Sequence, residues 1–263
     1  MGIFRTGNLS SRFLRVWQRN FTVYKKNWKI GFIPPILEPI FYIAAFGIGL
    51  SVMIKEFSYR GEPISYTAFI APALIAVNIM NSAFFENTYN SFVRMYYQKT
   101  FAAMLTTPLS LPEVISGEIL WGATKSVIGT LVMQTVLTCF GLINYPEGLI
   151  LPFIALLGGL IFGSLGMFFT AKVPSIDVFN LPIFLFITPM FLFSGTFFPL
   201  ENLPDWAQQL ALFLPLTHLV NLTRSCALGI FPIDLLWSLG YLLSLGLIVF
   251  PFAVRGMEKR MIQ

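Results

Sequence analysis

Charge is scarce in this sequence: charged residues make up 11% of its 263 residues, whereas hydrophobic residues make up 56%. A soluble domain carries about 25% charged residues, so this composition excludes an ordinary soluble globule. The chain has one histidine and two cysteines, and it contains no phosphate-binding loop, H-E-x-x-H pair or dinucleotide fingerprint. We therefore expect no catalytic residue, no metal site and no bound cofactor in this chain.

Long apolar runs fill most of the sequence. A helix needs about 20 apolar residues to cross a bilayer, and six runs are long enough. They are approximately Gly31–Ile54, Tyr66–Phe85, Ile119–Ile143, Leu149–Ala171, Leu181–Phe198 and Ile233–Val254. We predict an all-α polytopic membrane protein with six transmembrane helices. No apolar run precedes Trp28, so no cleavable signal peptide is expected. Cys139 and Cys226 lie in or beside these runs and are interpreted as buried free thiols.

The lysines and arginines predict the orientation. Of the 17, all but Lys55, Arg60 and Arg224 fall before the first span, between the second and third or near the start of the third, after the fourth, or at the end of the chain. Basic residues collect on the cytoplasmic side of membrane proteins. Both termini are therefore expected in the cytoplasm, and the formal charge of +5 is a topology signal. It does not indicate nucleic-acid binding.

Residues 10–29 have the spacing of an amphipathic helix. Its apolar face carries Phe13, Trp17, Phe21, Tyr24 and Trp28, and its cations lie opposite. Such a helix lies in the membrane interface with its rings toward the acyl chains. We expect residues 1–30 to form a cytoplasmic amphipathic helix, either as an anchor alone or also touching a partner subunit. Residues 31–263 would form the six-span domain.

Polar residues are rare inside the expected spans. Pro34, Pro35 and Pro39 should break or kink the first span, whose only charge is Glu38. The second span carries one polar stripe, which consists of Asn78, Ser82, Glu86 and Tyr89, with Asn81 beside it. A polar stripe on a membrane helix faces protein or water, so these groups either join helices or line a path for a polar substrate.

The connection between the second and third spans is long and contains a helix start. Ser110-Leu111-Pro112-Glu113 fits a capping box, with Ser110 as N-cap and Glu113 bonding back to it. A helix should therefore begin near Leu111 and continue into the third span. The fourth span contains small residues between Gly158 and Gly166, which favour close helix packing or a subunit contact.

Two short helices are expected between the fifth and sixth spans. After Pro204, the residues Trp206, Leu210, Phe213 and Leu214 recur at helical spacing, but the segment is too short to span. It should be a re-entrant or outer-leaflet helix. A second short helix is expected from about Thr217 to Arg224. His218 lies in it, and a lone histidine is more often a hydrogen-bonded structural residue than a ligand.

These features resemble the ABC-2-type transporter permeases, and within them the nodulation-factor (lipo-oligosaccharide) exporter permeases. The matching stretches are Ile36–Leu50, Phe84–Phe92, Phe101–Lys125, Phe191–Gln208 and Pro215–Arg224. The resemblance implies a six-span homodimer in a bacterial inner membrane. It also implies two copies of a separate ABC ATPase subunit, which would bind ATP and Mg, and contact with membrane lipids.

The resemblance also implies functional segments. A coupling segment at about 94–118 would contact the ATPase through Lys99, Phe101, Leu105, Thr107, Pro108, Leu109, Glu113 and Glu118. An external gate segment would occupy about 199–224. The substrate path or gate would comprise Glu38, Asn78, Asn81, Ser82, Glu86, Tyr89, Phe193, Phe197, Trp206 and His218.

Three functions remain open from the sequence. The first is ATP-driven export of an amphipathic substrate, either a saccharide-lipid or a hydrophobic drug. The second is an ion-coupled carrier, against which stands the shortage of ionisable groups at mid-membrane. The third is a membrane-embedded lipid-modifying enzyme, against which stands the missing acid–base or metal constellation.

Overall fold

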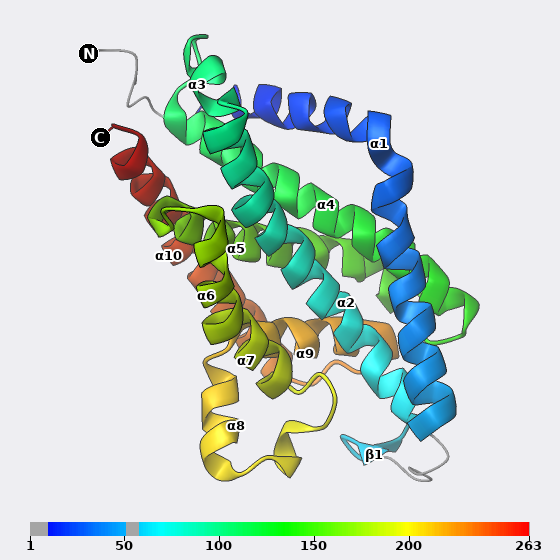
Figure 1. Cartoon of the computed structure of the whole chain (residues 1–263). Coiled ribbons are helices and arrows are strands. Elements are labelled where there is room, and N and C mark those ends of the chain that lie inside the picture. Colours follow the sequence, from blue (N-terminus) through cyan, green and yellow to red (C-terminus); the bar gives the residue numbers. More distant parts are fainter. Residues whose placement is uncertain (1–9, 51–57, 263) are drawn as a thin grey trace.

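The computed structural model describes residues 10–50 and 58–262, which form an almost entirely helical bundle (Figure 1). The first half contains α1 (Phe13–Tyr42), η1 (Ile43–Leu50), β1 (Ser58–Tyr59), β2 (Glu62–Pro63), α2 (Tyr66–Phe85), η2 (Glu86–Asn90), η3 (Val93–Tyr97), α3 (Thr100–Leu105) and α4 (Leu111–Cys139). The second half contains η4 (Glu147–Ile150), α5 (Leu151–Lys172), η5 (Ile176–Phe179), α6 (Asn180–Pro182), η6 (Ile183–Ile187), α7 (Thr188–Phe193), η7 (Leu200–Asn202), α8 (Asp205–Leu212), α9 (Pro215–Leu228) and α10 (Asp234–Ile262). The end of the expected first span and Lys55 lie outside the described residues.

Several helices are long and apolar enough to cross a membrane. Among the described residues four qualify, namely Tyr66–Tyr97, Glu147–Lys172, Ile176–Phe193 and Asp234–Met261, and a fifth is added if the two parts of a bent helix at the N-terminal end count as one span. The expected third span lies in α4, which is long enough at 29 residues but contains Lys125 and Gln134. The polytopic helical class is confirmed, and the count of six stays a prediction.

Helix α1 bends by 73° between Phe13–Lys26 and Gly31–Phe46, the second of which continues from α1 into η1 (Figure 1). The bend comes just before Pro34 and Pro35, which cannot donate hydrogen bonds to the preceding turn. The first part runs across one end of the bundle and the second runs along it. This is the geometry that an interfacial helix followed by a span requires.

The aromatic face of α1 packs on protein, so the expectation that its rings point toward acyl chains is wrong for three of them. Trp17 donates to Thr124 Oγ1 at 2.8 Å, and the rings of Phe21 and Tyr24 lie 6.3 and 5.4 Å from that of Trp121. Sequence periodicity identifies an apolar face but not what covers it. Here α4 covers it.

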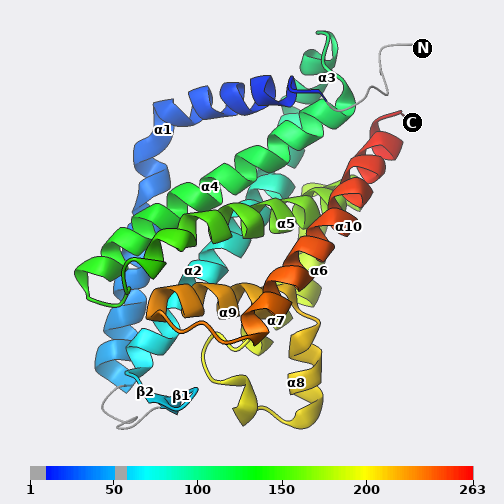
Figure 2. The same cartoon turned by 180° about the vertical axis from the view of Figure 1, so that it is seen from behind.

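Helix α5 lies at the centre of the bundle, between α2, α4 and α10 (Figure 2). A Cβ at Gly159 would come within 2.7 Å of the Cα of Ala123, and one at Gly166 within 2.8 Å of the Phe84 carbonyl oxygen. Only glycine permits such close backbone approach. The small residues of α5 therefore serve helix packing within this chain.

The region after α5 departs in detail from the expected spans. The fifth span ends at Phe193 and not at Phe198, because Gly195 has a positive φ and the chain turns there. Both expected short helices are present, as α8 and α9. Most of α9 is buried against α2 and α10. Both cysteines are free, but Cys139 is exposed at the end of α4, so its expected burial is wrong.

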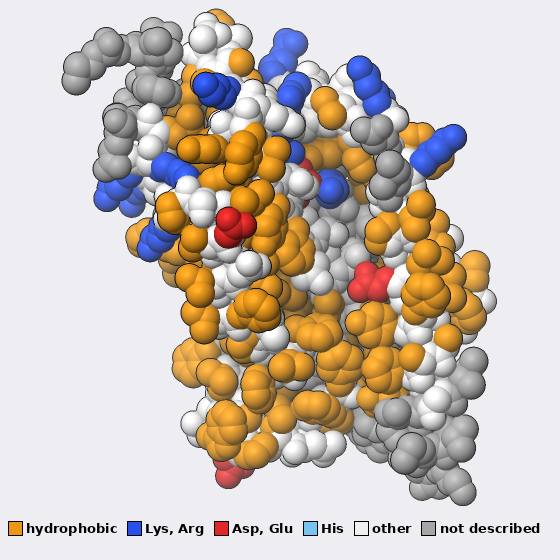
Figure 3. Space-filling view, in the orientation of Figure 1, with side chains coloured by type: hydrophobic (Ala, Val, Ile, Leu, Met, Phe, Trp, Pro, Cys, Tyr) orange, Lys and Arg blue, Asp and Glu red, His pale blue; other side chains and the backbone are white. Residues whose placement is uncertain are grey.

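The surface separates charged from apolar side chains. On the face shown in Figure 3, lysines and arginines gather at the end that carries both termini and α3, and hydrophobic side chains cover most of the rest. Exposed apolar residues include Phe153, Phe184, Leu185, Trp237 and Leu247. Apolar exposure on this scale fits a surface that faces lipid.

Candidate functional site

The chain reverses direction at the charged end of the bundle, between α2 and α4. Glu113 accepts a hydrogen bond from the Ser110 backbone N–H at 2.7 Å, and the predicted capping box is present. Helix α4 begins at Leu111, as predicted. The Ser10 hydroxyl also donates to Glu113, and Arg12 Nη1 donates to the Pro108 carbonyl at 2.8 Å. The N-terminal arm therefore fastens the start of α4.

Glu113 is held as a carboxylate. Burial alone would raise its pKa, but hydrogen bonds from Ser10 and Ser110, together with the nearby Arg12 guanidinium, hold the pKa below its ordinary value. A charged acceptor at a helix N-terminus also interacts favourably with the helix dipole. The start of α4 is thus a rigid point in an otherwise exposed connection.

The residues expected to contact an ATPase divide into two sets. Lys99, Thr107 and Pro108 are exposed, and Leu109 is half-buried. The buried set is Phe101, Leu105, Glu113 and Glu118. The buried side chains cannot touch a partner in this arrangement, and they position the segment instead.

The exposed surface between η3 and α4 includes residues that the sequence analysis did not single out. We call it the apex, and it consists of Tyr96, Tyr97, Gln98, Lys99, Ala102, Ala103, Thr106, Thr107 and Pro108. Tyr96 and Tyr97 are each 60% exposed. The sequence does contain a feature that could have indicated this surface, namely the two adjacent tyrosines close to Lys99.

Behind the apex, four charged side chains form a buried network. Arg94 Nη1 lies 2.8 Å from Glu86 Oε1, and Arg94 Nη2 lies 2.5 Å from Glu118 Oε2. Lys125 Nζ lies 2.9 Å from Glu86 Oε2. We call Glu86, Arg94, Glu118 and Lys125 the charge network. Its two carboxylates and two cations balance, as charges removed from water require.

Neutral donors complete the charge network. Trp121 Nε1 donates to Glu86 at 3.0 Å, Asn20 Nδ2 donates to Glu118 at 2.8 Å, and the Ser91 hydroxyl donates to Glu118 at 2.9 Å. These groups come from α1, from the end of α2 with its π-helical turns, and from α4. The network therefore connects the two segments that flank the apex to each other and to the N-terminal helix.

The structure brings together two residues to which we gave separate roles. Glu86 was expected in a substrate path and Glu118 at the ATPase, yet both bind Arg94. Sequence reasoning missed Arg94, Lys125 and Asn20. The one sequence feature that could have indicated the charge network is that Glu86 and Lys125 are charged residues near the ends of apolar spans.

The polar stripe on α2 is shorter than expected. Asn78 is buried beside Gly129 of α4, Ser82 lies near it, and the Glu38 carboxylate hydrogen-bonds with Asn78. Asn81 is half-buried. Tyr89 leaves the stripe, and its ring packs 5.2 Å from that of Phe179. The π-helical turn Glu86–Asn90 adds residues per turn and rotates Tyr89 away.

A cavity of about 360 Å³ opens beside the charge network. Its lining is mostly polar and aromatic, with Arg19, Asn20, Tyr24, Asn90, Arg94, Gln98, Trp121 and Lys125 among the lining residues. We call it the polar recess. It combines amide, cationic and indole groups, which suit a ligand that carries hydroxyl groups.

At the opposite end of the bundle lies an aromatic cluster. The Phe197 ring lies 6.0 Å from Phe46 and 5.0 Å from Phe191, and the Tyr66 hydroxyl donates to the Phe197 carbonyl at 2.8 Å. Phe193 packs 6.2 Å from Trp206, which is 64% exposed. The cluster joins the ends of α1, α2 and α7.

His218 lies apart from the aromatic cluster. Its ring nitrogens lie 2.9 Å from the Leu212 carbonyl and 3.1 Å from the Ser238 hydroxyl, and it stacks on Tyr241. Burial lowers its pKa, and the hydrogen bond with Leu212 opposes that effect only in part. This is the structural histidine that the sequence favoured. Within the described residues, no group of three or more His, Cys, Asp and Glu side chains could hold a metal ion.

Known proteins match this chain over most of its length. Residues 11–228 match the family described as ABC-2 type transporter. The chain is 40% identical over 218 residues to nodulation protein J of Rhizobium leguminosarum bv. viciae, with 82% of each chain covered. It is 36% identical over 255 residues to nodulation protein J of Rhizobium leguminosarum bv. trifolii, with 97% of this chain and 95% of that protein covered. Nodulation protein J of Neorhizobium galegae is 33% identical over 267 residues, with both chains fully covered.

Proposed function

This chain belongs to the ABC-2 type transporter family, and we propose that it is the membrane permease subunit of an exporter driven by a separate ATPase. Two copies of the permease would work with two ATPase subunits in a bacterial inner membrane, with both termini in the cytoplasm. The cargo is an amphipathic saccharide-lipid, for which lipo-oligosaccharide is the leading case.

The charge network is the observation that carries the coupling part of this proposal. An ATPase pushing on the apex moves α3 and the start of α4, which the capping box and the N-terminal arm stiffen. The network transfers that movement to α2, because Arg94 is ion-paired with Glu118 of α4 and Glu86 is ion-paired with Lys125 of α4. Arg94 and Glu86 are also ion-paired with each other. A rigid connection transmits a push, whereas a flexible loop absorbs it.

The polar recess supports the saccharide part. Amide, indole and charged groups line it. Sugar hydroxyls would bond to the exposed amides of Asn90 and Gln98, while a lipid chain remains in the bilayer. The similarity to proteins named nodulation protein J points to the same substrate class.

The experiment is a mild-detergent pull-down of the tagged chain from its native membranes, followed by an ATPase assay. We expect a near-stoichiometric ATP-binding subunit and vanadate-sensitive hydrolysis, stimulated by a lipo-oligosaccharide. Recovery of the chain alone without hydrolysis, combined with flux that follows an ion gradient, would transfer the assignment to a carrier.

A matched pair of variants locates the coupling surface. Ala103→Arg places a long cation on the exposed apex, and Gln209→Arg places the same side chain on exposed α8 at the other end. The first should reduce ATPase recovery and stimulated hydrolysis by about tenfold or more, the loss expected when a charge is forced into an interface core. The second should change neither. Equal effects of both variants would remove the apex from the proposal.

A further inference from the structure

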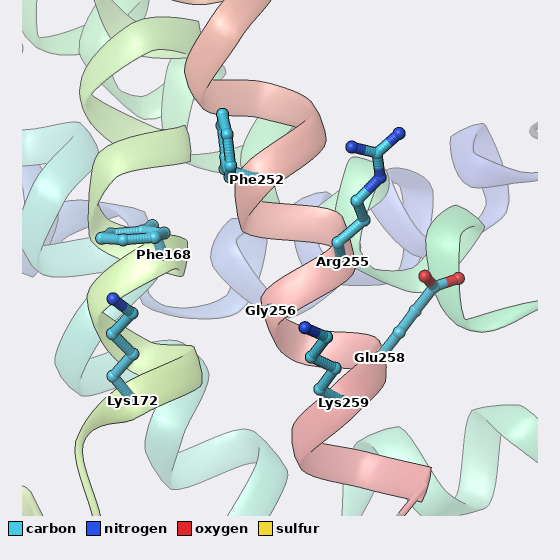
Figure 4. A pocket seen from close by; sticks show the side chains of 7 residues that line it. All are labelled: Phe168, Lys172, Phe252, Arg255, Gly256, Glu258 and Lys259. Carbon is cyan, nitrogen blue, oxygen red and sulfur yellow. The ribbon is translucent and has the colours of Figure 1, made fainter.

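A second basic site lies at the charged end of the bundle, between α5 and α10 (Figure 4). It is a groove of about 800 Å³, lined by Phe168, Lys172, Phe252, Arg255, Gly256, Glu258 and Lys259. We call it the basic groove. None of its residues belongs to the charge network or the apex.

The basic groove is apolar on one level and cationic on the next. Phe168 and Phe252 form its apolar part, and Phe252 is 56% exposed on a helix long and apolar enough to span the membrane. Lys172 follows Phe168 by about one helical turn, and Lys259 follows Phe252 by about two turns. Both lysines are exposed. On both helices an apolar ring is followed, toward the charged end of the bundle, by an exposed ammonium group, which is the order in which acyl chains give way to headgroups.

Within the part of the chain that the structure describes, no carboxylate lies between Lys172 and Lys259 (Figure 4). Figure 4 shows the Lys259 side chain directed toward α5, while Glu258 and Arg255 extend from the other side of α10. Lys172 Nζ lies 4.3 Å above the Phe168 ring. Across the described part of the chain, neither lysine takes part in any of the ion pairs, which involve only Arg60, Arg94 and Lys125 with Asp and Glu residues.

The walls of the basic groove are fixed. Arg260 Nη1 donates to the Val173 carbonyl at 2.6 Å and also to the Thr170 carbonyl, which ties the end of α5 to α10. A Cβ at Gly256 would lie 3.1 Å from the Cβ of Ala171, so the two helices are close at the floor. The two ammonium groups are therefore presented by a preformed surface.

We propose that the basic groove binds the phosphate of an anionic phospholipid from the leaflet that meets this end of the molecule. Lys172 and Lys259 bind the phosphate oxygens, and an acyl chain lies along Phe168 and Phe252. Neutral lipids lack the net charge that two uncompensated cations attract, so the groove selects anionic headgroups. The site is independent of the cargo and of the ATPase.

The test titrates the purified full-length chain in detergent with phosphatidylglycerol or phosphatidylcholine and counts bound lipids by native mass spectrometry. We expect phosphatidylglycerol to bind at least about tenfold more tightly than phosphatidylcholine. Lys172→Gln with Lys259→Gln should weaken phosphatidylglycerol binding roughly 30-fold, since each cation near an anionic lipid contributes about fivefold. Equal binding of the two lipids by the unmodified chain would overturn the proposal.

Two controls separate this site from general attraction to a basic surface. Lys26→Gln with Lys29→Gln removes two exposed cations outside the groove and should change binding about twofold or less, because salt screens them. Glu258→Gln removes a carboxylate that points away from the two lysines (Figure 4), so it should tighten binding by about twofold or less. An equal loss in the control pair would assign the effect to overall charge.

The last part of the test compares the lipid with a free anion, glycerol 3-phosphate. Glycerol 3-phosphate has no acyl chains, and its phosphate monoester carries more negative charge than the phosphodiester of phosphatidylglycerol. It should still bind far more weakly than phosphatidylglycerol if Phe168 and Phe252 hold a chain. If glycerol 3-phosphate binds as tightly as phosphatidylglycerol, the groove is a free-phosphate site and the lipid assignment is wrong.

Discussion

The charge network and the basic groove lie at the same end of the molecule and use their charges in opposite ways. In the network, Glu86 and Glu118 are 3% and 0% exposed, and two cations neutralise them. In the groove, Lys172 and Lys259 are exposed and unpaired within the described residues. Buried charges must balance because water cannot solvate them, whereas exposed charges can remain unbalanced and attract an outside partner. The first arrangement suits force transmission and the second suits recognition.

The largest effect should come from breaking the balance of the network. Arg94→Met leaves Glu86 with Lys125 alone and leaves Glu118 without a cation, and it should destabilise the protein by about 3–5 kcal/mol. Thermal unfolding of the purified chain measures this. Arg94→Met with Glu118→Met restores neutrality and should cost clearly less.

The same double variant sharpens the role of the network. Because it removes the Arg94–Glu118 ion pair and the hydrogen bond from Ser91 to Glu118, it should fold yet lose substrate-stimulated ATPase activity in the reconstituted complex. A double variant that is stable and fully coupled would leave the network with a structural role only.

A smaller effect should come from Lys125, the network member nearest to solvent. Its side chain is 31% exposed, and Glu86 keeps Arg94 when Lys125 is lost. Lys125→Met should therefore destabilise by about 1–2 kcal/mol, below the cost of losing a fully buried partner. Chemical denaturation compares it with Arg94→Met. If the two cost the same, burial does not distinguish the network's members.

A still smaller effect concerns the capping box beside the network. The pKa of Glu113 is held below its ordinary value of 4.5, so the unfolded chain binds the proton first. The stabilisation is present above pH 4.5 and is lost as the pH falls through the lower folded pKa. Glu113→Gln should cost about 1 kcal/mol at neutral pH and should flatten this part of the pH–stability curve. If the stability of Glu113→Gln falls at acid pH in the same way as that of the unmodified chain, other carboxylates control this part of the pH–stability curve.

The smallest effect on stability is expected in the basic groove. Lys172→Gln with Lys259→Gln removes no contact with a buried group, so unfolding in lipid-free detergent should change by less than about 0.5 kcal/mol. The difference from the unmodified chain should appear only when phosphatidylglycerol is added. A large loss without lipid would mean that the lysines support the fold itself.

Local sequence rules worked where a feature depends on neighbours in the chain. The capping box of Ser110 and Glu113 is present, and the short helices α8 and α9 occur where Pro204 and Pro215 allow them to start. The tight packing of Gly159 and Gly166 also followed from residue size. The capping box and the two helix starts require only a few adjacent residues to be compatible with one backbone. The glycine packing was predicted from residue size alone, although its partners lie on other helices.

The same rules failed where distant segments meet. The ring stripe of α1 is real, but periodicity could not tell that α4 covers Trp17, Phe21 and Tyr24. Tyr89 left its stripe because a π-helical turn changed the register, which a constant helical period cannot anticipate.

The sequence by itself determined that this chain is a helical membrane protein of the ABC-2 type. Its composition cannot cover a soluble globule, and its motifs are local. Only the tertiary structure decided that Glu86, Arg94, Glu118 and Lys125 bind one another and that, among the described residues, no carboxylate pairs with Lys172 or Lys259. Each ionic contact depends on distances between helices far apart in the chain, and burial then decides whether a charge must be paired or can stay open to a ligand.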